Sequence, residues 1–245
     1  MLHTGMTGEG MTVDYQQRLD EVESRIRAAC ARAGRIRESV ELIAVSKTKP
    51  VEMIEGFYRC GQHSFGENRP QELRDKYDLC PVDISWHMIG HLQKNKIKYV
   101  LGRAILIHSV DSRELAAAIE QEAAKRDLAA DVLLEVNVAG EESKDGLRAE
   151  ETAALARFAG TLPHLHVRGL MTVAPFVDDP EENRPVFRAL RELSVDIARQ
   201  NIDNVSMNVL SMGMTNDYEI AIEEGATCIR VGTALFGARD HASPR

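Results

Sequence analysis

The sequence predicts a single α/β domain folded as a (β/α)₈ barrel of the TIM type, with an extra helix at its N-terminal end. Eight short apolar segments alternate with amphipathic segments, and such alternation implies a parallel sheet. The 245 residues match the length of one such barrel. No linker rich in Pro, Gly or Ser divides them. Eight units favour a closed barrel over an open doubly wound sheet, which stays the alternative architecture.

The first expected element is an amphipathic helix. Its apolar side chains recur at steps of three and four residues, at Leu19, Val22, Ile26, Cys30 and Ala33. Gly34 follows this stripe and is expected to end the helix. Residues 1–12 hold several Gly and Thr but neither an apolar core nor a basic leader, so we expect a flexible tail rather than a signal peptide. The barrel domain is then expected to span residues 13–245.

The eight expected strands are short, largely apolar runs. They are Glu41–Ser46, His63–Gly66, Trp86–Ile89, Ala104–Ser109, Val132–Asn137, His166–Met171, Val205–Leu210 and Cys228–Val231. Each strand except the last is followed by a clear helical segment, as shown by the apolar stripe at Val186, Leu190, Leu193 and Ile197. Prolines mark the loops and helix starts between them.

The composition excludes several classes of function. A formal net charge of −8 gives no general attraction to nucleic acid or to an anionic membrane. The four cysteines are scattered without a C-x-x-C pair, so we expect neither a metal site nor a disulfide framework. No apolar run reaches the length of a membrane span. We therefore expect a cytoplasmic protein with no nucleic-acid, membrane or metal partner.

Lys47 ends the first expected strand, E-L-I-A-V-S-K, and shares a face of it with Ile43 and Val45. Functional groups of such barrels lie at the C-terminal ends of the strands. Burial lowers the pKa of a lysine, and the neutral amine can attack an aldehyde to form a Schiff base. Two alternatives stay open. In the first, Lys47 simply emerges into water or pairs with a carboxylate. In the second, the reactive amine is Lys49, in the loop before Pro50.

Two glycine-bearing turns are expected after the last two strands, at Ser211–Thr215 and Arg230–Thr233. Phosphate sites of these barrels are often built from this pair of loops. Glycine lets backbone N–H groups approach an anion, and hydroxyls add further donors. The alternative is a pair of tight turns that cap the following helices, with Thr215 or Asn216 at one helix start.

Arg230 lies inside the strand-like run C-I-R-V, where a guanidinium needs a partner. It could donate to a ring nitrogen of a cofactor, which would keep that nitrogen unprotonated and weaken the ring as an electron sink. An internal salt bridge with a barrel carboxylate such as Glu135 is the alternative.

Eight motifs follow one another along the chain. They read L-I-A-V-S-K-T-K-P around Lys47, F-G-E-N to Asn68, W-H-M-I-G-H-L-Q-K-N-K from Trp86, H-S-V-D-S from His108, E-V-N-V-A-G-E-E-S-K-D-G from Glu135, G-L-M to Met171, L-S-M-G-M-T-N-D from Leu210 and R-V-G-T-A-L-F-G from Arg230. In this order they resemble the pyridoxal-phosphate homeostasis protein family, from about Tyr15 to Arg239. That family in turn resembles the N-terminal barrel domain of alanine racemase.

The resemblance implies a protein that binds pyridoxal 5′-phosphate (PLP), protects its aldehyde and delivers it to apo-enzymes that use it. It implies Lys47 as the Schiff-base lysine and Arg230 near the pyridine nitrogen. The other implied pocket residues are Asn68, His87 and Met171 along the walls, with Ser211, Gly232, Thr233 and the neighbouring Thr215 at the phosphate. Thr215 stands where the family usually has serine, and the hydroxyl is retained. We expect a monomer.

A PLP-dependent amino-acid racemase is the competing function. A two-base racemase needs an acid/base group on each face of the substrate carbanion. In alanine racemase the second group comes from a β-rich C-terminal domain and a partner subunit, and we expect this chain, which ends at Arg245, to lack that domain. The tyrosines that could substitute all fall in expected helices, at Tyr15, Tyr58, Tyr77, Tyr99 and Tyr218. We therefore expect a carrier rather than an enzyme. Aldolase-like lysine chemistry would fit Lys47 but leaves the resemblance unexplained.

Overall fold

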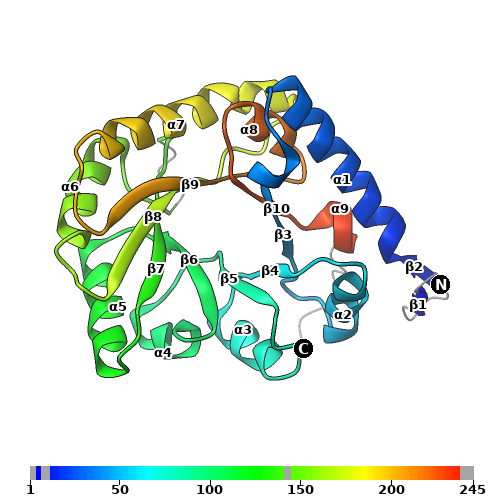
Figure 1. Ribbon diagram of the computed structural model, residues 1–245, viewed down its shortest axis with the longest axis horizontal. Coiled ribbons are helices and arrows are strands. Elements are labelled where there is room, and N and C mark those ends of the chain that lie inside the picture. Colours follow the sequence, from blue (N-terminus) through cyan, green and yellow to red (C-terminus); the bar gives the residue numbers. More distant parts are fainter. Residues whose placement is uncertain (1–3, 7–11, 141–144, 238–245) are drawn as a thin grey trace.

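Eight parallel strands form a closed barrel in the computed structural model, which describes residues 4–6, 12–140 and 145–237 (Figure 1). The barrel strands are β3 (Glu41–Val45), β4 (Ser64–Glu67), β5 (Ser85–Met88), β6 (Ala104–Val110), β7 (Ala130–Glu135), β8 (Leu165–Met171), β9 (Val205–Met214) and β10 (Cys228–Val231). Pairing of β10 with β3, which sets Arg230 beside Ile43, closes the sheet. The expected (β/α)₈ barrel is confirmed, and the open sheet is excluded.

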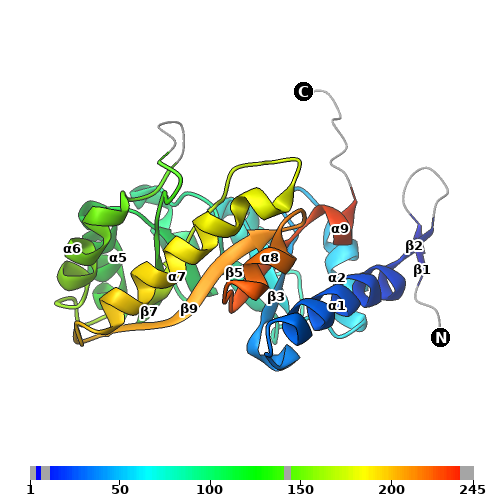
Figure 2. The ribbon, with the colours of Figure 1, turned by 90° about the horizontal axis from the view of Figure 1, so that it is seen from above.

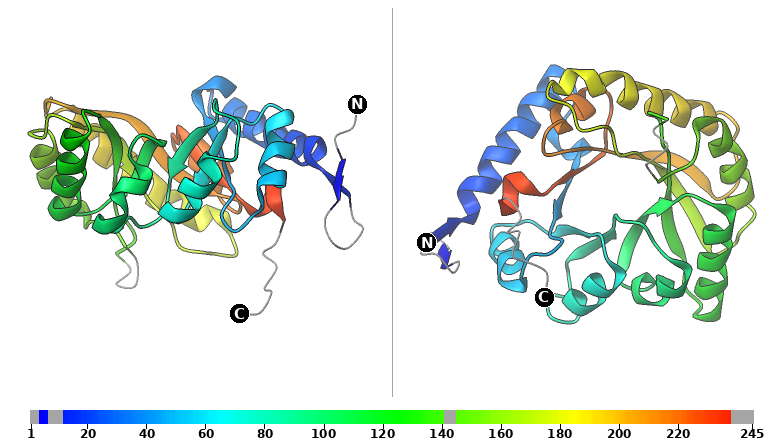
Figure 3. Two further views of the ribbon diagram at one scale, coloured as in Figure 1. Left: turned by 90° about the horizontal axis from the view of Figure 1, so that it is seen from below. Right: turned by 180° about the vertical axis from the view of Figure 1, so that it is seen from behind.

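Helices surround the barrel as an outer layer (Figures 1 and 3). They are α2 (Val51–Arg59), α3 (Pro70–Tyr77), α4 (Ile97–Val100), α5 (Arg113–Lys125), α6 (Ala149–Ala159), α7 (Arg184–Ala198), α8 (Tyr218–Glu223) and α9 (Thr233–Phe236), with short 3₁₀ turns η1 (Arg37–Ser39), η2 (Lys94–Lys96) and η3 (Pro180–Asn183). The last strand is thus followed by a helix of one turn. All five tyrosines lie in helices, as expected.

The expected opening helix is α1 (Tyr15–Arg32), which lies across α8 on the outside of the barrel (Figure 2). It ends as expected at Gly34, whose φ of +65° suits glycine. There the Arg35 N–H donates to the Cys30 carbonyl at 2.8 Å, which completes the C-terminal cap. Arg32 forms an ion pair with Glu223 of α8 at 2.6 Å, which links the first helix to α8 near the end of the barrel sequence.

The N-terminal stretch holds a short antiparallel pair, β1 (Thr4–Met6) with β2 (Thr12–Asp14). The rest of the tail expected over residues 1–12 lies outside the described residues. The division into a tail and a barrel domain therefore stays a prediction.

The seventh barrel strand differs from its expected bounds. It was expected to end at Leu210, but β9 continues to Met214, so Ser211 lies inside a strand rather than in a turn. Gly213 is required there on two counts: its φ of +91° suits glycine, and a Cβ on it would lie 2.6 Å from the Ala221 Cβ in α8. Gly213 thus lets α8 approach the barrel.

The core has two parts with different chemistry. One large apolar cluster, containing Trp86 and Phe187, fills the space between the strands and the helices. Inside the barrel, a smaller cluster of Leu106, Leu133 and Met171 lies beside buried polar side chains. Over the described part of the chain, no helix has both the length and the apolar character that crossing a membrane requires.

Candidate functional site

A cavity of about 580 Å³ opens at the C-terminal ends of the strands, within the size range of small-molecule sites. Its apolar walls come from Val45, Ile89, Val173, Pro175, Phe176 and Met214, and its polar groups from Lys47, Asn68, Thr215, Asn216, Asp217, Arg230, Gly232 and Thr233. It joins the ends of β3, β4, β9 and β10. Strand ends of parallel barrels carry the functional groups, so the cavity lies where the fold predicts a site.

Lys47 enters this cavity from the loop that follows β3, and its side chain is half-buried. Val45, two residues earlier, lines the same cavity, as expected from the alternation of strand side chains. Lys49 is not among the lining residues. Of the two candidate amines, only Lys47 lies in the cavity.

Two hydroxyl groups and a glycine backbone face the cavity at the ends of β9 and β10. The Gly232 N–H donates to the Thr215 hydroxyl at 3.3 Å, and Thr233 follows directly. The β9 end of this wall is fixed by Asp217, which accepts from the Met214 N–H at 2.7 Å and from the Asn183 amide at 2.8 Å. Both carboxylate oxygens of Asp217 are therefore engaged in holding the loop.

Arg230 forms the polar part of the cavity floor and is only 4% exposed. Its guanidinium donates to the Ser211 hydroxyl at 2.5 Å and to the Thr172 carbonyl at 2.8 Å. Burial lowers the pKa of Arg230, while Glu135 and Asp217 oppose that shift from a distance. Within the described ranges, the guanidinium of Arg230 is bound by Ser211 and Thr172 and forms no ion pair with Glu135, so the expected alternative of an internal salt bridge to Glu135 is not formed.

Glu135 is itself unusual, because burial raises its pKa to about 7, helped by the charges of Asp111 and Asp145 and opposed by Arg230. A carboxyl whose pKa is higher in the folded state stabilises the fold below the unfolded value of 4.5, and this stability is lost as the pH rises through about 7. We therefore expect Glu135→Gln to increase the free energy of unfolding at pH 8.5 by roughly 1–3 kcal/mol. The gain should disappear at pH 4.5.

Urea unfolding of the ligand-free protein at both pH values measures this difference. Glu150→Gln, at an exposed carboxylate that pairs with Arg148, is the matched control and should change stability equally at both. If Glu135→Gln changes the free energy of unfolding equally at both pH values, the pKa of Glu135 is not raised in the folded protein.

A line of polar side chains crosses the barrel interior beneath Arg230. His108 Nδ1 lies 2.9 Å from the Ser211 hydroxyl, and His108 Nε2 lies 3.1 Å from His87 Nδ1. His87 Nε2 in turn faces Glu41 at 3.4 Å. Ser211, His108 and His87 are all buried, so the line connects the cavity floor to the opposite, N-terminal end of the barrel.

The donors along this line follow from Arg230, which can only donate. Since Ser211 accepts from Arg230, its own proton is available to His108 Nδ1, and His108 Nε2–H then donates to His87. Burial lowers the pKa of His108, reinforced by His87 and Arg230, which agrees with a neutral ring. At the far end, burial raises the pKa of Glu41, but the nearby His87 ring and the hydrogen bonds from Ser64 and Cys228 outweigh it and set the value at about 2.

The structure thus brings together six of the nine residues expected in the site. These are Lys47, Asn68, Thr215, Arg230, Gly232 and Thr233. The other three, His87, Met171 and Ser211, lie beneath the cavity rather than among its lining residues. Ser211 departs furthest from the expected arrangement, because its buried hydroxyl is engaged by Arg230 and His108 and it is not among the lining residues.

Sequence reasoning missed the wall formed by Val173, Pro175 and Phe176 after β8. Phe176 is 86% exposed at the rim, which is unusual for a phenylalanine. The proline was read only as a loop marker, because a loop's position over a barrel mouth depends on the fold. Asn183 and Asp217 were missed for the same reason, since their bond joins residues 34 apart.

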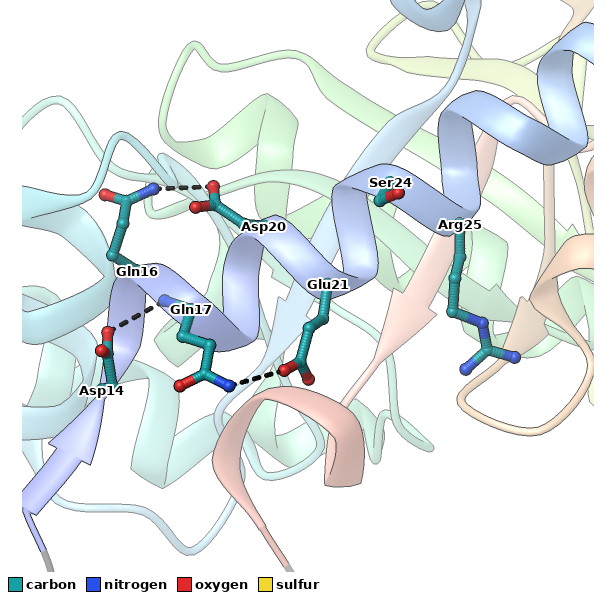
Figure 4. Close-up of a pocket in the computed structure, with 7 residues that line it drawn as sticks. All are labelled: Asp14, Gln16, Gln17, Asp20, Glu21, Ser24 and Arg25. Carbon is teal, nitrogen blue, oxygen red and sulfur yellow. Dashed lines mark hydrogen bonds between the residues drawn. The ribbon is translucent and has the colours of Figure 1, made fainter.

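A second hollow, of about 730 Å³, lies on the outer face of α1 (Figure 4). Its lining residues come from one helix and the residue that caps it, and they pair along that helix, as Gln16 does with Asp20 and Gln17 with Glu21 at 2.9 Å. Three of them are acidic: Asp14, Asp20 and Glu21. This surface repels anions, so the cavity at the barrel mouth is the better candidate site.

Comparison with known proteins agrees with the resemblance found in the sequence. The family model of the alanine racemase N-terminal domain matches residues 17–240. A protein of Aquifex aeolicus (strain VF5) named pyridoxal phosphate homeostasis protein is 48% identical over 226 residues, which cover 92% of this chain and 98% of that protein.

Solved structures extend the comparison. PipY of Synechococcus elongatus PCC7942, solved with PLP bound, has a TM-score of 0.79 and 33% identity, and the match covers 91% of this chain and all of that one. An alanine racemase of Clostridium difficile 630 has a TM-score of 0.73 at 14% identity. That match covers 92% of this chain but 57% of the racemase, and it shows the fold alone.

Proposed function

Since this chain belongs to the pyridoxal phosphate homeostasis protein family, we propose that its barrel mouth holds PLP covalently through Lys47, shields the aldehyde and passes the coenzyme on to other proteins. When bound, the coenzyme supplies a reactive aldehyde and an aromatic ring that withdraws electrons. The observation that carries the proposal is the single cavity that joins Lys47, Arg230 and the hydroxyls of Thr215 and Thr233.

The groups of the cavity fit the parts of this coenzyme. Lys47 supplies the amine, and the apolar side chains of Val45 and Ile89 can flank a ring. Thr215, Thr233 and the backbone around Gly232 offer donors to a phosphate at the two loops where such barrels bind it. Asp217, the one carboxylate among the described lining residues, turns both oxygens toward protein donors, which partly offset its charge at the cavity.

Arg230 has a different role from the hydroxyls. As a donor without acceptor capacity, it would hold the ring nitrogen unprotonated and so limit electron withdrawal by the ring. The line from Ser211 through His108 fixes the orientation of the guanidinium from below. Arg230 thereby favours holding the coenzyme over promoting carbanion chemistry on it.

The lining residues do not provide the two bases of a racemase. Lys47 is one basic group, but among the described residues no tyrosine or histidine lines the cavity. Asp217 is committed to the loop. A second proton acceptor on the opposite face of a substrate is therefore missing from the described lining. This supports a carrier without racemase activity.

Two assays on the loaded protein test this function. We expect the loaded protein to restore the activity of an apo-enzyme that depends on PLP, because the link through a lysine is reversible. Incubated with L-alanine, it should form D-alanine no faster than free coenzyme does, as measured by chiral chromatography. An equal concentration of free coenzyme is the control in both assays. Rapid formation of D-alanine would contradict the carrier, and a coenzyme that never leaves would contradict delivery.

A further inference from the structure

The loop that carries Lys47 is held by an ionic cluster of two buried residues and one partly exposed residue, none of which lines the cavity. The cluster consists of Glu67 at the end of β4 and of Glu72 and Lys76 in α3. Lys76 is 7% exposed and Glu67 is 0% exposed, which is rare for charged residues. Burying such charges costs several kcal/mol unless they are paired and hydrogen-bonded. A cluster of this kind next to Lys47 calls for an explanation.

Lys76 is fully satisfied by three acceptors. Its ammonium donates to Glu67 at 2.8 Å, to Glu72 at 2.7 Å and to the backbone carbonyl of Ser46 at 2.8 Å. An ammonium has three protons, so none is left over. The Ser46 hydroxyl adds a fourth contact by donating to Glu67 at 2.6 Å. One side of the Lys47 loop is therefore fastened to the cluster through both the backbone and the side chain of Ser46.

The other side of the loop is fastened by Glu72. The same carboxylate oxygen that accepts from Lys76 also accepts from the backbone N–H of Thr48, at 2.6 Å. Thr48 has a φ of +63°, a left-handed conformation that is strained for a β-branched residue. Such a conformation persists only where its surroundings impose it. Two bonds hold it here: the turn bond from the Lys49 N–H to the Ser46 carbonyl at 3.0 Å, and the Glu72 contact.

The two held groups have a special relation to Lys47. The Ser46 carbonyl belongs to the peptide group before the Lys47 Cα, and the Thr48 N–H belongs to the peptide group after it. With both peptide planes fixed, the direction in which the Lys47 side chain leaves the backbone is fixed as well. The cluster is thus a clamp on one residue, and that residue enters the cavity.

We propose that Glu72 and Lys76 are positioning residues that aim the Lys47 amine at the bound aldehyde, and so set the rate of covalent attachment. The proposal rests on the proposed function. It differs from a purely structural role, which would affect stability but not the attachment rate. Misplacing a reacting group by about 1 Å can cost on the order of 100-fold in rate.

Glu72→Ala is the main test, because it removes the acceptor of the Thr48 N–H, whereas Glu72→Gln keeps an acceptor oxygen. Stopped-flow mixing with PLP measures the rate at which the visible absorbance band of the lysine-bound coenzyme appears. We expect Glu72→Ala to slow it roughly 10- to 100-fold and Glu72→Gln to restore much of the rate. Asp75→Ala, at an exposed carboxylate on the same helix that pairs with Arg74, is the matched control and should attach at the wild-type rate.

Two further measurements separate aiming from binding and from folding. Pyridoxine 5′-phosphate lacks the aldehyde, so its affinity reports the cavity alone and should be equal in all variants. Amide hydrogen exchange of the wild type should show a protected Thr48 N–H despite its exposed loop.

The double variant Lys76→Met/Glu67→Gln replaces the buried ions by neutral groups of similar size, keeps the fold and loses the Ser46 carbonyl contact, so it should also attach slowly.

The outcomes distinguish the two proposals. A wild type that forms no visible band overturns the proposed function and the clamp with it. A wild type that forms the band, with a folded Glu72→Ala that attaches equally fast, overturns the clamp alone. An unprotected Thr48 amide in the wild type also overturns the clamp, whether or not the variants fold.

Discussion

Lys47→Ala should form no visible absorbance band with PLP, and sodium borohydride should fix no coenzyme on it. Lys47 is the amine that lines the cavity, whereas Lys49 is not among the lining residues. The remaining contacts, from Arg230 and the hydroxyls of the cavity, would then hold the coenzyme without a covalent bond. Attachment within an oriented site is worth several orders of magnitude in effective concentration, so we expect the affinity to fall on the order of 100-fold or more.

Lys49→Ala is the matched control, because it removes the same side chain two residues further along the same loop. It should keep the band, and peptide mapping after borohydride treatment should find the coenzyme on Lys47 in both Lys49→Ala and the wild type. A band that persists in Lys47→Ala, or a label on Lys49, would move the attachment point and remove the basis of the proposed function.

The sequence predicted the barrel and its first helix because local signals agreed with the global fold. Apolar periodicity located all eight strands, and the stripe that ends at Gly34 located α1. Lys47, Arg230 and Gly232 were found for a related reason. Each lies at or near a strand end, and the topology of a parallel barrel brings all strand ends to one face.

The errors arose where one residue type serves two purposes. The run S-M-G-M has the residues of a turn, yet it continues β9 to Met214. Gly213 has the positive φ that the pattern suggested, +91°, but it also lies against Ala221 of α8, a neighbour that the sequence alone does not place there. His87 was expected in the pocket, but its partners, His108 and Glu41, come from two other strands and lie deeper in the barrel.

The sequence also failed to predict the clamp formed by Glu67, Glu72 and Lys76. In the sequence, Lys76 is one of several lysines and arginines on a short polar helix, where a solvated side chain is the default expectation. Its burial follows from the approach of α3 to the loop after β3, and this approach brings Ser46 within 2.8 Å of the ammonium. Local pattern therefore located Lys47, which lines the cavity, but not the residues that hold its loop.

Gly169→Ala should have the largest effect on stability, because there is no room for even one methyl group at this position. A Cβ on Gly169 of β8 would lie 1.8 Å from the carbonyl oxygen of Val209, its paired residue in β9. That oxygen belongs to the backbone of β9, which also pairs with β10 from Ser211 onward in the closed barrel. Overpacking typically costs about 1–3 kcal/mol, and a clash with backbone rather than with a flexible side chain puts Gly169→Ala at the upper end of that range. For a domain of this size we expect the Tm of the ligand-free protein to fall by roughly 6–12 °C.

Gly232→Ala is the matched control for the methyl group. Its Cβ would lie 3.5 Å from the Val45 Cβ, an ordinary contact distance, and the residue has a negative φ of −111°. The ligand-free Tm of Gly232→Ala should therefore equal that of the wild type in differential scanning calorimetry, while its added methyl projects beside the proposed phosphate donors and weakens coenzyme binding. The two variants thus separate the barrel from the site: one methyl group should damage the fold at Gly169 and only the binding at Gly232. Equal Tm values for all three proteins would mean that β8 and β9 can move apart, and the closed barrel would then be more compliant than its pairing indicates.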